Sequence, residues 1–322
     1  MLEITDEHYE ELKELYLHND FSKFNIADTT RLWCMKHKVE YNDSLRRKVS
    51  KILRRGLGEY DPKSPTTAKI LVYDIETSPL LAYTFSPWQT NIRHTSIKQD
   101  WKILSFSAKW LFSNEVISFR LSPEELKTFD DKRITNELWN LLDNCDIAIA
   151  HNGIKFDNKK ANAKFLEHKL PPTSSFFTID TCYHAKKRFG FTYNSLDYLG
   201  KFLGFGGKLE TKSGLWDDVM AGDYESLVQM DEYCQRDVKL LEDVYLAMRP
   251  FIAPHPHVGV YVIGDKPTCP SCGHDELHNI HKDYATTVNI YEAYRCTNCE
   301  ALSRKRKPIH KANQNILSSL PR

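Results

Sequence analysis

The sequence predicts an α/β protein, in which a mixed sheet flanked by helices lies between a helical N-terminal unit and a C-terminal zinc ribbon. Strand patterns at 69–74, 103–110 and 116–121 precede alternating helix and strand patterns, which favours a mixed sheet covered by helices. Two Cys-x-x-Cys pairs near the C-terminus favour a separate metal-binding module. The expected parts are a helical unit at 1–58, a linker at 59–67, a main domain at 68–250, a ribbon at 255–307 and a basic, polar tail at 308–322.

Composition narrows the class of protein. The 322 residues are 41% hydrophobic, which permits a proper core. Because no stretch approaches 18 apolar residues and the N-terminus is acidic and polar, we expect neither a membrane span nor a signal peptide. Four of the eight cysteines are scattered singly and four are paired, which favours a reduced protein in the cytoplasm over a disulfide scaffold.

The first 58 residues are expected to form a small helical unit. A helical pattern at 29–37 carries Leu32 and Met35, and Ser44 suits the N-cap of a basic helix at 45–55. This arrangement resembles a helix-turn-helix DNA-binding unit, although a solvated basic face on a small bundle explains it equally well. The residues of this helix expected to contact nucleic acid are Arg46, Arg47, Lys51 and Arg54.

Asp74 and Glu76 end a short apolar run that reads as a buried strand. Residues i and i+2 of a strand point to the same side, so the two carboxylates aim at one place. Adjacent anions repel, and oxygen-only ligands favour Mg²⁺ or Mn²⁺. A second Asp-x-Glu pair, Asp223 and Glu225, lacks a preceding strand and is interpreted as a helix cap or first-turn charge.

Two later segments place further carboxylates. Asp157 follows the expected strand at 146–150 and the turn at Asn152, where α/β sheets bind ligands; the alternative is that Asp157 only caps the next helix. Tyr233 and Asp237 are four residues apart in a long helical pattern and share a face. A pair with the same spacing, at 193 and 197, is assigned instead to a packing helix at 195–203.

The three loci together resemble the motifs of the DEDD exonuclease superfamily, which has an RNase H-like fold. Asp74-x-Glu76 is similar to the first motif, the segment ending at Asp157 to the second, and Tyr233-x-x-x-Asp237 to the third, in its tyrosine subclass. The stretches 179–181 and 194–199 are similar to the exonuclease domains of B-family polymerases and of stand-alone phage relatives. The resemblance covers residues 68–250.

The resemblance implies 3′→5′ hydrolysis of nucleic acid by two metal ions. Asp74, Glu76, Asp157 and Asp237 would hold two Mg²⁺ or Mn²⁺ ions about 4 Å apart, which activate a water and stabilise the leaving 3′ oxygen. Tyr233 would orient or deprotonate that water. The residues expected by analogy to hold the terminal nucleotide are Thr77, Leu80, Asn152 and Phe156.

The C-terminal cysteines form the most specific motif. Cys269, Cys272, Cys296 and Cys299 are two zinc knuckles separated by 23 residues, and four cysteines complete one structural Zn²⁺ site. Two disulfides are the alternative. The basic run that follows contributes Arg304, Lys305 and Arg306 as candidate phosphate contacts, with a solvated tail as the rival interpretation.

The expected protein is therefore a monomeric nuclease whose flanking modules hold nucleic acid, DNA with a free 3′ end rather than RNA. The combination of modules resembles bacteriophage or mobile-element proteins, which places it in a host cytoplasm. Two alternatives remain open, a proofreading subunit that acts in DNA replication with a separate polymerase and a non-catalytic nucleic-acid-binding protein.

Overall fold

The computed structural model describes residues 8, 11–12, 26–41, 45, 49, 68–86, 88, 91–208, 214–262 and 266–310. The chain divides into two compact units. One comprises Met1–Thr67 with Tyr261–Ile263, and the other comprises Ala68–Val260 with Gly264–Arg322.

The smaller unit contains helix α2 (Ile26–His37) and a small apolar cluster. Trp33 and Cys34 are buried in this cluster with Leu12, Leu45 and Val49. Leu32 and Met35, expected on the apolar side of this helix, are exposed instead, because the buried face is one residue out of step with them. The basic residues Arg46, Arg47, Lys51 and Arg54 lie outside the described residues.

A five-stranded mixed sheet forms the centre of the larger unit. Its middle strand β1 (Ile70–Thr77) pairs antiparallel with β4 (Ile103–Trp110) and parallel with β6 (Ile147–Ala150). The edge strands β5 (Ile117–Arg120) and β7 (Phe177–Asp180) complete the order β5-β4-β1-β6-β7. This is the RNase H-like mixed sheet that the sequence predicts.

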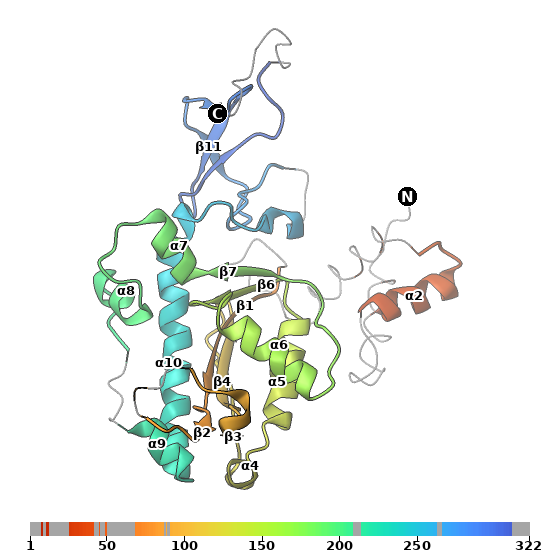
Figure 1. Cartoon of the computed structure of the whole chain (residues 1–322). Coiled ribbons are helices and arrows are strands. Elements are labelled where there is room, and N and C mark those ends of the chain that lie inside the picture. The colour runs from red at the N-terminus through yellow and green to blue at the C-terminus, as the bar shows by residue number, and fades with distance from the viewer. Residues whose placement is uncertain are drawn as a thin grey trace. The chain divides into compact units, whose positions relative to one another are not determined.

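Helices cover both faces of the sheet (Figure 1). Leu71, Tyr73 and Ile75 pack in one core cluster with residues of α5 (Lys132–Asp143) and α6 (Asp157–Glu167). Ile70 and Val72 belong to a second cluster, with residues of α10 (Tyr224–Met248). Because side chains alternate along a strand, Asp74 and Glu76 continue the second set and face α10.

Shorter helices and a two-stranded arm complete the larger unit around the sheet. The helices are α4 (Pro123–Thr128), α7 (Thr181–Arg188), α8 (Leu196–Phe202) and α9 (Leu215–Met220). The arm pairs β2 (Leu81–Ala82) with β3 (Ile97–Gln99) and includes the 3-10 turn η1 (His94–Ser96). Two further 3-10 turns, η2 (Arg249–Phe251) and η3 (Val258–Tyr261), follow α10.

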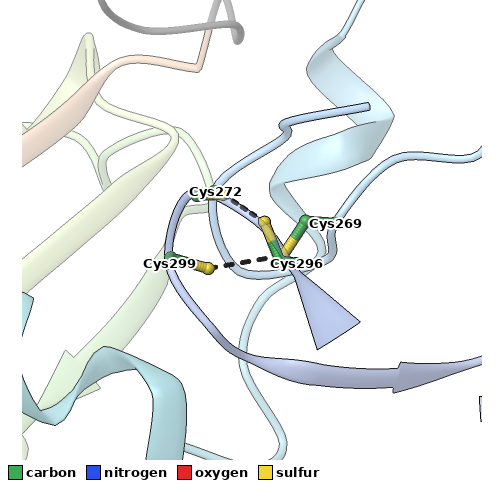
Figure 2. A group of neighbouring side chains, drawn as sticks. All are labelled: Cys269, Cys272, Cys296 and Cys299. Carbon is green, nitrogen blue, oxygen red and sulfur yellow. Dashed lines mark hydrogen bonds between the residues drawn. The ribbon is translucent and has the colours of Figure 1, made fainter. Parts of the chain in front are cut away.

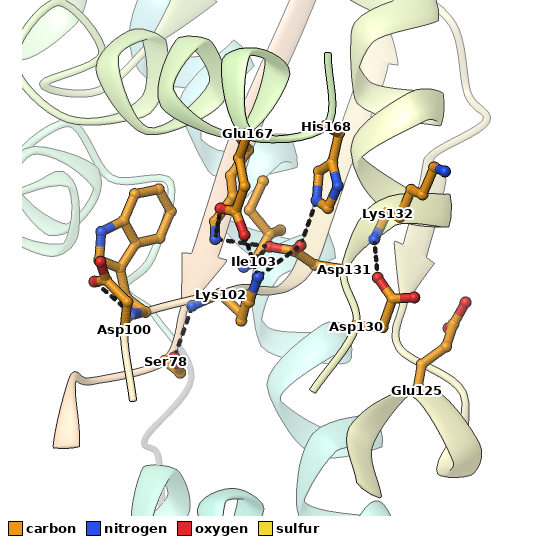
Figure 3. Close-up of polar contacts among 12 residues, drawn as sticks. Ser78, Asp100, Lys102, Ile103, Glu125, Asp130, Asp131, Lys132, Glu167 and His168 are labelled. Atoms are coloured by element: carbon orange, nitrogen blue, oxygen red, sulfur yellow. Dashed lines mark hydrogen bonds and ion pairs between the residues drawn. The ribbon is translucent and has the colours of Figure 1, made fainter. Parts of the chain in front are cut away.

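A buried ionic cluster joins β4, α5 and α6 (Figure 3). The fully buried carboxylate of Asp131 accepts hydrogen bonds from the Ile103 backbone N–H at 2.9 Å and from His168 Nε2 at 2.7 Å. Lys164 Nζ lies 3.4 Å from Asp131 and 2.6 Å from Glu167, and Lys102 pairs with the same two carboxylates. Two anions and two lysines thus neutralise each other, with Asp131 and Lys164 buried and Glu167 exposed at the rim.

Helix α10 is fixed to the sheet by polar contacts as well as by apolar packing. Glu242 pairs with Lys109 and accepts a hydrogen bond from the Phe112 backbone N–H at 2.7 Å. Nearer the start of the helix, Asp231 accepts a hydrogen bond from Arg120 Nη1 at 2.7 Å. These anchors on β4 and β5 hold the intervening residues, Tyr233 to Asp237, opposite β1.

The C-terminal module is a set of short strands around four cysteines. Its three-stranded sheet contains β8 (Leu277–Asn279), β11 (Ala293–Cys296) and β12 (Leu302–Arg304), and a hairpin pairs β9 (Tyr284–Ala285) with β10 (Ile290–Tyr291). The main core continues past α10 through Ile252 to Val258, whose N–H donates to the carbonyl of Pro270 at 2.7 Å. Among the described helices, none is long and apolar enough to cross a membrane.

Candidate functional site

The acidic pair of β1 lies where the sheet opens. The ladder between β1 and β6 runs only from Ile70 to Val72, so the β6 side of Asp74 and Glu76 has no strand beside it. The region beyond the carboxyl ends of parallel strands is the usual ligand position in an open α/β sheet. Ligand atoms of Asp74, Glu76 and Cys234 lie within 4.8 Å of one another, which is close enough for a shared metal ion.

Asp157 reaches the same opening from the start of α6. Its Oδ1 accepts a hydrogen bond from the Ile75 backbone N–H at 3.2 Å, so a side chain takes the place of the missing ladder bond. The turn before it needs a left-handed Asn152 (φ 70°), and a Cβ on Gly153 would lie 2.5 Å from that of Ala150. Phe156 rather than Asp157 occupies the N-cap position, so the capping alternative does not apply.

Asp180 holds this turn in place. Its two carboxylate oxygens accept from the backbone N–H groups of Asn152 at 2.9 Å and Ile154 at 3.2 Å. Asp180 also caps α7 by accepting from the Tyr183 N–H at 3.0 Å. The end of β7 therefore sets the position from which Asp157 enters the site.

Helix α10 supplies the opposite wall of the site. Asp237 is buried, and its Oδ1 has no hydrogen-bond partner among the described residues. Its Oδ2 pairs with Lys208, whose Nζ also donates to the hydroxyl of Tyr233 at 2.8 Å. Asp197 accepts from the Lys208 backbone N–H at 2.8 Å, so the second Tyr-x-x-x-Asp pair serves to position this lysine.

The four carboxylates interact through their charges. Burial and the charge of Asp237 raise the pKa of Asp74 to about 7. Burial and the charge of Asp74 raise the pKa values of Glu76 and Asp157 well above their usual range. Burial also raises the pKa of Asp237, although Lys208 opposes the shift. Within the part of the chain that the structure describes, Lys208 is the lysine that opposes the shifts of Asp74, Glu76 and Asp237, and a bound cation would favour the charged carboxylates further.

The hydrogen bond between Lys208 and Tyr233 influences the pKa values of both side chains. Burial raises the pKa of Tyr233 to about 12 despite the adjacent lysine, so the phenol stays protonated at neutral pH. Burial alone would lower the pKa of Lys208, but the charge of Asp237 and its hydrogen bonds outweigh burial and raise it. Lys208 therefore stays charged, and the Tyr233 oxygen that it holds keeps its proton for donation to another group.

The residues expected at the terminal nucleotide surround this opening. Thr77 ends β1 and its carbonyl accepts from Trp216 Nε1 at 3.3 Å, while Leu80 follows it and is exposed. The backbone of Asn152 forms the turn, and the ring of Phe156 is exposed. Arg304, Lys305 and Arg306 are exposed in the C-terminal module, where the charge of Lys305 is already paired with Glu292 at 2.6 Å.

Lys208, Asp180 and Cys234 are the site residues that motif spacing did not single out. Lys208 lies in irregular chain 25 positions before Tyr233, and no local pattern connects the two. Cys234 donates toward Asp74 Oδ2 at 3.8 Å, although its helical spacing from other apolar residues indicates only a packing role. Asp180 lay within a stretch noted for its resemblance, and its place at the end of a strand was the available signal.

The four cysteines of the C-terminal module converge on one point (Figure 2). The Sγ atoms of Cys269 and Cys299 are 3.6 Å apart, as are those of Cys272 and Cys296, and all four lie within 4.8 Å of one another. A disulfide needs about 2.05 Å between sulfurs, whereas tetrahedral zinc with Zn–S bonds of about 2.3 Å places them about 3.8 Å apart. All eight cysteines are described and none is in a disulfide.

Comparisons with known proteins give a likeness of fold alone. No protein-family model matches the chain, and no curated protein matches it in sequence. Among solved structures, a family B DNA polymerase from the hyperthermophilic archaeon Pyrobaculum calidifontis is similar, with a TM-score of 0.43 and 12% identity. The likeness covers 60% of this chain and 25% of that polymerase, so this chain spans about a quarter of its length.

Proposed function

We propose that this protein is a metal-dependent 3′→5′ exonuclease that hydrolyses nucleic acid, DNA in preference to RNA. The observation that supports this most strongly is the charge interaction of Asp74 with Glu76, Asp157 and Asp237 at the open edge of the sheet, where Lys208 pairs with Asp237. The resemblance of the three motifs to the DEDD superfamily agrees with it.

The donor set fits a pair of divalent cations. The buried Oδ1 of Asp237 has no hydrogen-bond partner among the described residues, and all four carboxylates have raised pKa values, as expected for ligands that await a cation. Oxygen donors suit Mg²⁺ and Mn²⁺. When bound, these ions would supply an activated water and stabilise the charge that develops on the leaving 3′ oxygen.

The chain's own groups would then orient the reactants. The protonated hydroxyl of Tyr233, held by Lys208, is placed to donate a hydrogen bond and so orient a water or a phosphate oxygen rather than to remove a proton. The ammonium group of Lys208 adds positive charge beside Asp237. The exposed ring of Phe156 is available to stack on the terminal base, next to the Asn152 turn.

The two Asp-x-Glu pairs provide a matched test. Glu76→Gln should lower the rate of nucleotide release by about 1000-fold, since a cation ligand is lost. Glu225→Gln, at the exposed first turn of α10, should change it by less than about twofold. The assay follows 5′-labelled DNA and RNA with Mg²⁺ or Mn²⁺, and stepwise shortening that EDTA stops is the expected pattern. Full activity of purified Glu76→Gln protein would remove the acidic site from the mechanism.

The two Tyr-x-x-x-Asp segments provide a second pair of matched variants for the same assay. Tyr233→Phe should slow turnover by about 10–100-fold without weakening metal binding, because the phenol orients and does not ligate. Tyr193→Phe, at the exposed member of the second Tyr-x-x-x-Asp pair, should have no effect. Equal rates for both variants would make Tyr233 a packing residue.

A further inference from the structure

The arm at residues 78–102 leaves the sheet directly after the acidic pair of β1. Its base is closed by two hydrogen bonds of 2.9 Å, from the Ser78 N–H to the Lys102 carbonyl and from the Lys102 N–H to Ser78 Oγ. Above the base, Leu81 pairs with Gln99, and the Tyr83 N–H donates to the Ser96 carbonyl at 3.0 Å. The arm is therefore anchored two residues from Glu76 (Figure 1).

Large aromatic side chains of the arm point into solvent. Tyr83 is 70% exposed and Trp88 is 87% exposed, and Phe85 is also exposed. Isolated exposed apolar residues are ordinary, but three aromatic rings within six positions are a concentration that marks an interaction surface. Tyr83 and Trp88 in particular keep most of their surface accessible to solvent.

The charged side chains of the outer arm, before Asp100, are all basic. Between Glu76 and Asp100 the sequence has no acidic residue, whereas Arg93, His94 and Lys98 are exposed. Lys98 Nζ lies 4.8 Å from the centre of the Tyr83 ring, so a cation and an aromatic face are presented together. A protein in which acidic and basic residues are almost equal in number has concentrated one sign here.

Aromatic and basic groups continue from the arm toward the acidic site. Lys160 Nζ lies 3.6 Å from the centre of the Trp101 ring, at the base of the arm, and 5.6 Å from that of Phe156. Phe156 directly precedes Asp157. The chain thus places a succession of rings and ammonium groups between the outer arm and the carboxylates.

We propose that the arm binds the unpaired nucleotides that lead into the site, with Tyr83 and Trp88 stacking on bases and Arg93 and Lys98 contacting phosphates. Exposed rings with interspersed cations match single strands, whose base faces are accessible, whereas a duplex hides all base faces except those at its ends. The proposal rests on the exonuclease function and deepens it by naming a single strand as the substrate.

The double variant Tyr83→Ala/Trp88→Ala tests this assignment. Base stacking contributes about 1–3 kcal/mol per ring, so its KM for a single-stranded oligonucleotide should rise about tenfold per ring while kcat changes less than about twofold. Phe177→Ala, an exposed ring at the far end of β6 and β7, is the matched control and should leave KM unchanged. The p-nitrophenyl ester of thymidine 5′-monophosphate, too small to reach the arm, should be cleaved equally by all three proteins.

Several results would overturn the arm's role. These are an unchanged KM in the double variant, an equal loss of affinity for blunt duplex and single strand, or slower cleavage of the small ester. If wild-type protein cleaves neither substrate, the exonuclease function fails on its own. Fluorescence anisotropy of a labelled single strand in EDTA then still tests whether the arm binds nucleotides. Binding that is lost in the double variant supports this role, and binding that the double variant retains refutes it.

Discussion

Two groups of carboxylates in the larger unit, one around the buried Asp131 and one around Asp74, differ in how their charge is balanced. Around Asp131, two anions meet Lys102 and Lys164, and the hydrogen bonds of these lysines lower the pKa of Glu167 to about 2 although burial opposes the shift. Around Asp74, the charge of Lys208 opposes the shifts of Asp74, Glu76 and Asp237, yet the pKa values of all four carboxylates are raised. The first group is balanced by its own lysines and joins elements of the fold, whereas the raised pKa values of the second agree with the proposal that it binds cations.

The four cysteines extend this comparison, and their metal should have the largest effect on stability. Four adjacent thiolates would repel one another without a metal ion, and structural zinc contributes about 10–16 kcal/mol to small domains. Protein purified without chelator should carry about one zinc per chain, and its removal should unfold the C-terminal module, as measured by metal analysis and thiol titration. Zinc content near zero, with a folded module, would contradict the assignment.

The balanced cluster should be sensitive to loss of a single charge. Asp131→Asn leaves the buried Lys164 without one of its two anions, and breaking a buried pair costs about 3–5 kcal/mol. Urea unfolding in EDTA should show this loss, whereas Glu76→Gln, which relieves repulsion, should be as stable as the wild type or more so. A loss of equal size in both variants would mean that the two clusters do the same structural work.

The unbalanced cluster should instead respond to cations and to pH. Folding raises the pKa of Asp74 from 3.8 to about 7, so without divalent ions the protein becomes less stable as pH rises between these values. Mg²⁺ at about 100 times its Kd should add about 2.7 kcal/mol at pH above 7, and less at lower pH because a proton must leave first. Urea unfolding with and without Mg²⁺ measures this, and the gain should vanish in Glu76→Gln. A gain independent of pH would contradict the raised pKa.

The sequence predicted the elements whose signals are local. The strand at Ile103–Trp110 has the expected bounds, and those expected around Asp74 and Ala150 differ by a few residues, because short apolar runs between polar turns define them. The interpretation of Asp223 as a helix cap is confirmed by its hydrogen bond from the Glu225 N–H. The Cys-x-x-Cys spacing likewise located the cysteine cluster, since knuckle geometry is encoded within four residues.

Features that depend on contacts across the chain were missed. Lys208 acquires its place through Asp197, Tyr233 and Asp237, which come from two different helices. The buried face of α2 was misjudged because Trp33 and Cys34, rather than Leu32 and Met35, face the partners in its own unit. In both cases the decisive neighbours are distant in sequence, and periodicity alone carries no information about them.

The packing of residues 245–258 at the end of α10 limits how the C-terminal module can be separated from the sheet domain or exchanged. Tyr245, Ile252 and Val258 belong to one continuous core, and the Tyr245 hydroxyl and His255 Nε2 are 3.0 Å apart. A protein truncated directly after α10 would lose Ile252 and Val258, would expose the apolar surface that these residues cover, and should aggregate. Gene fusions or recombination events that bring in a different ribbon would have to preserve the chain through Val258 and its bond to Pro270.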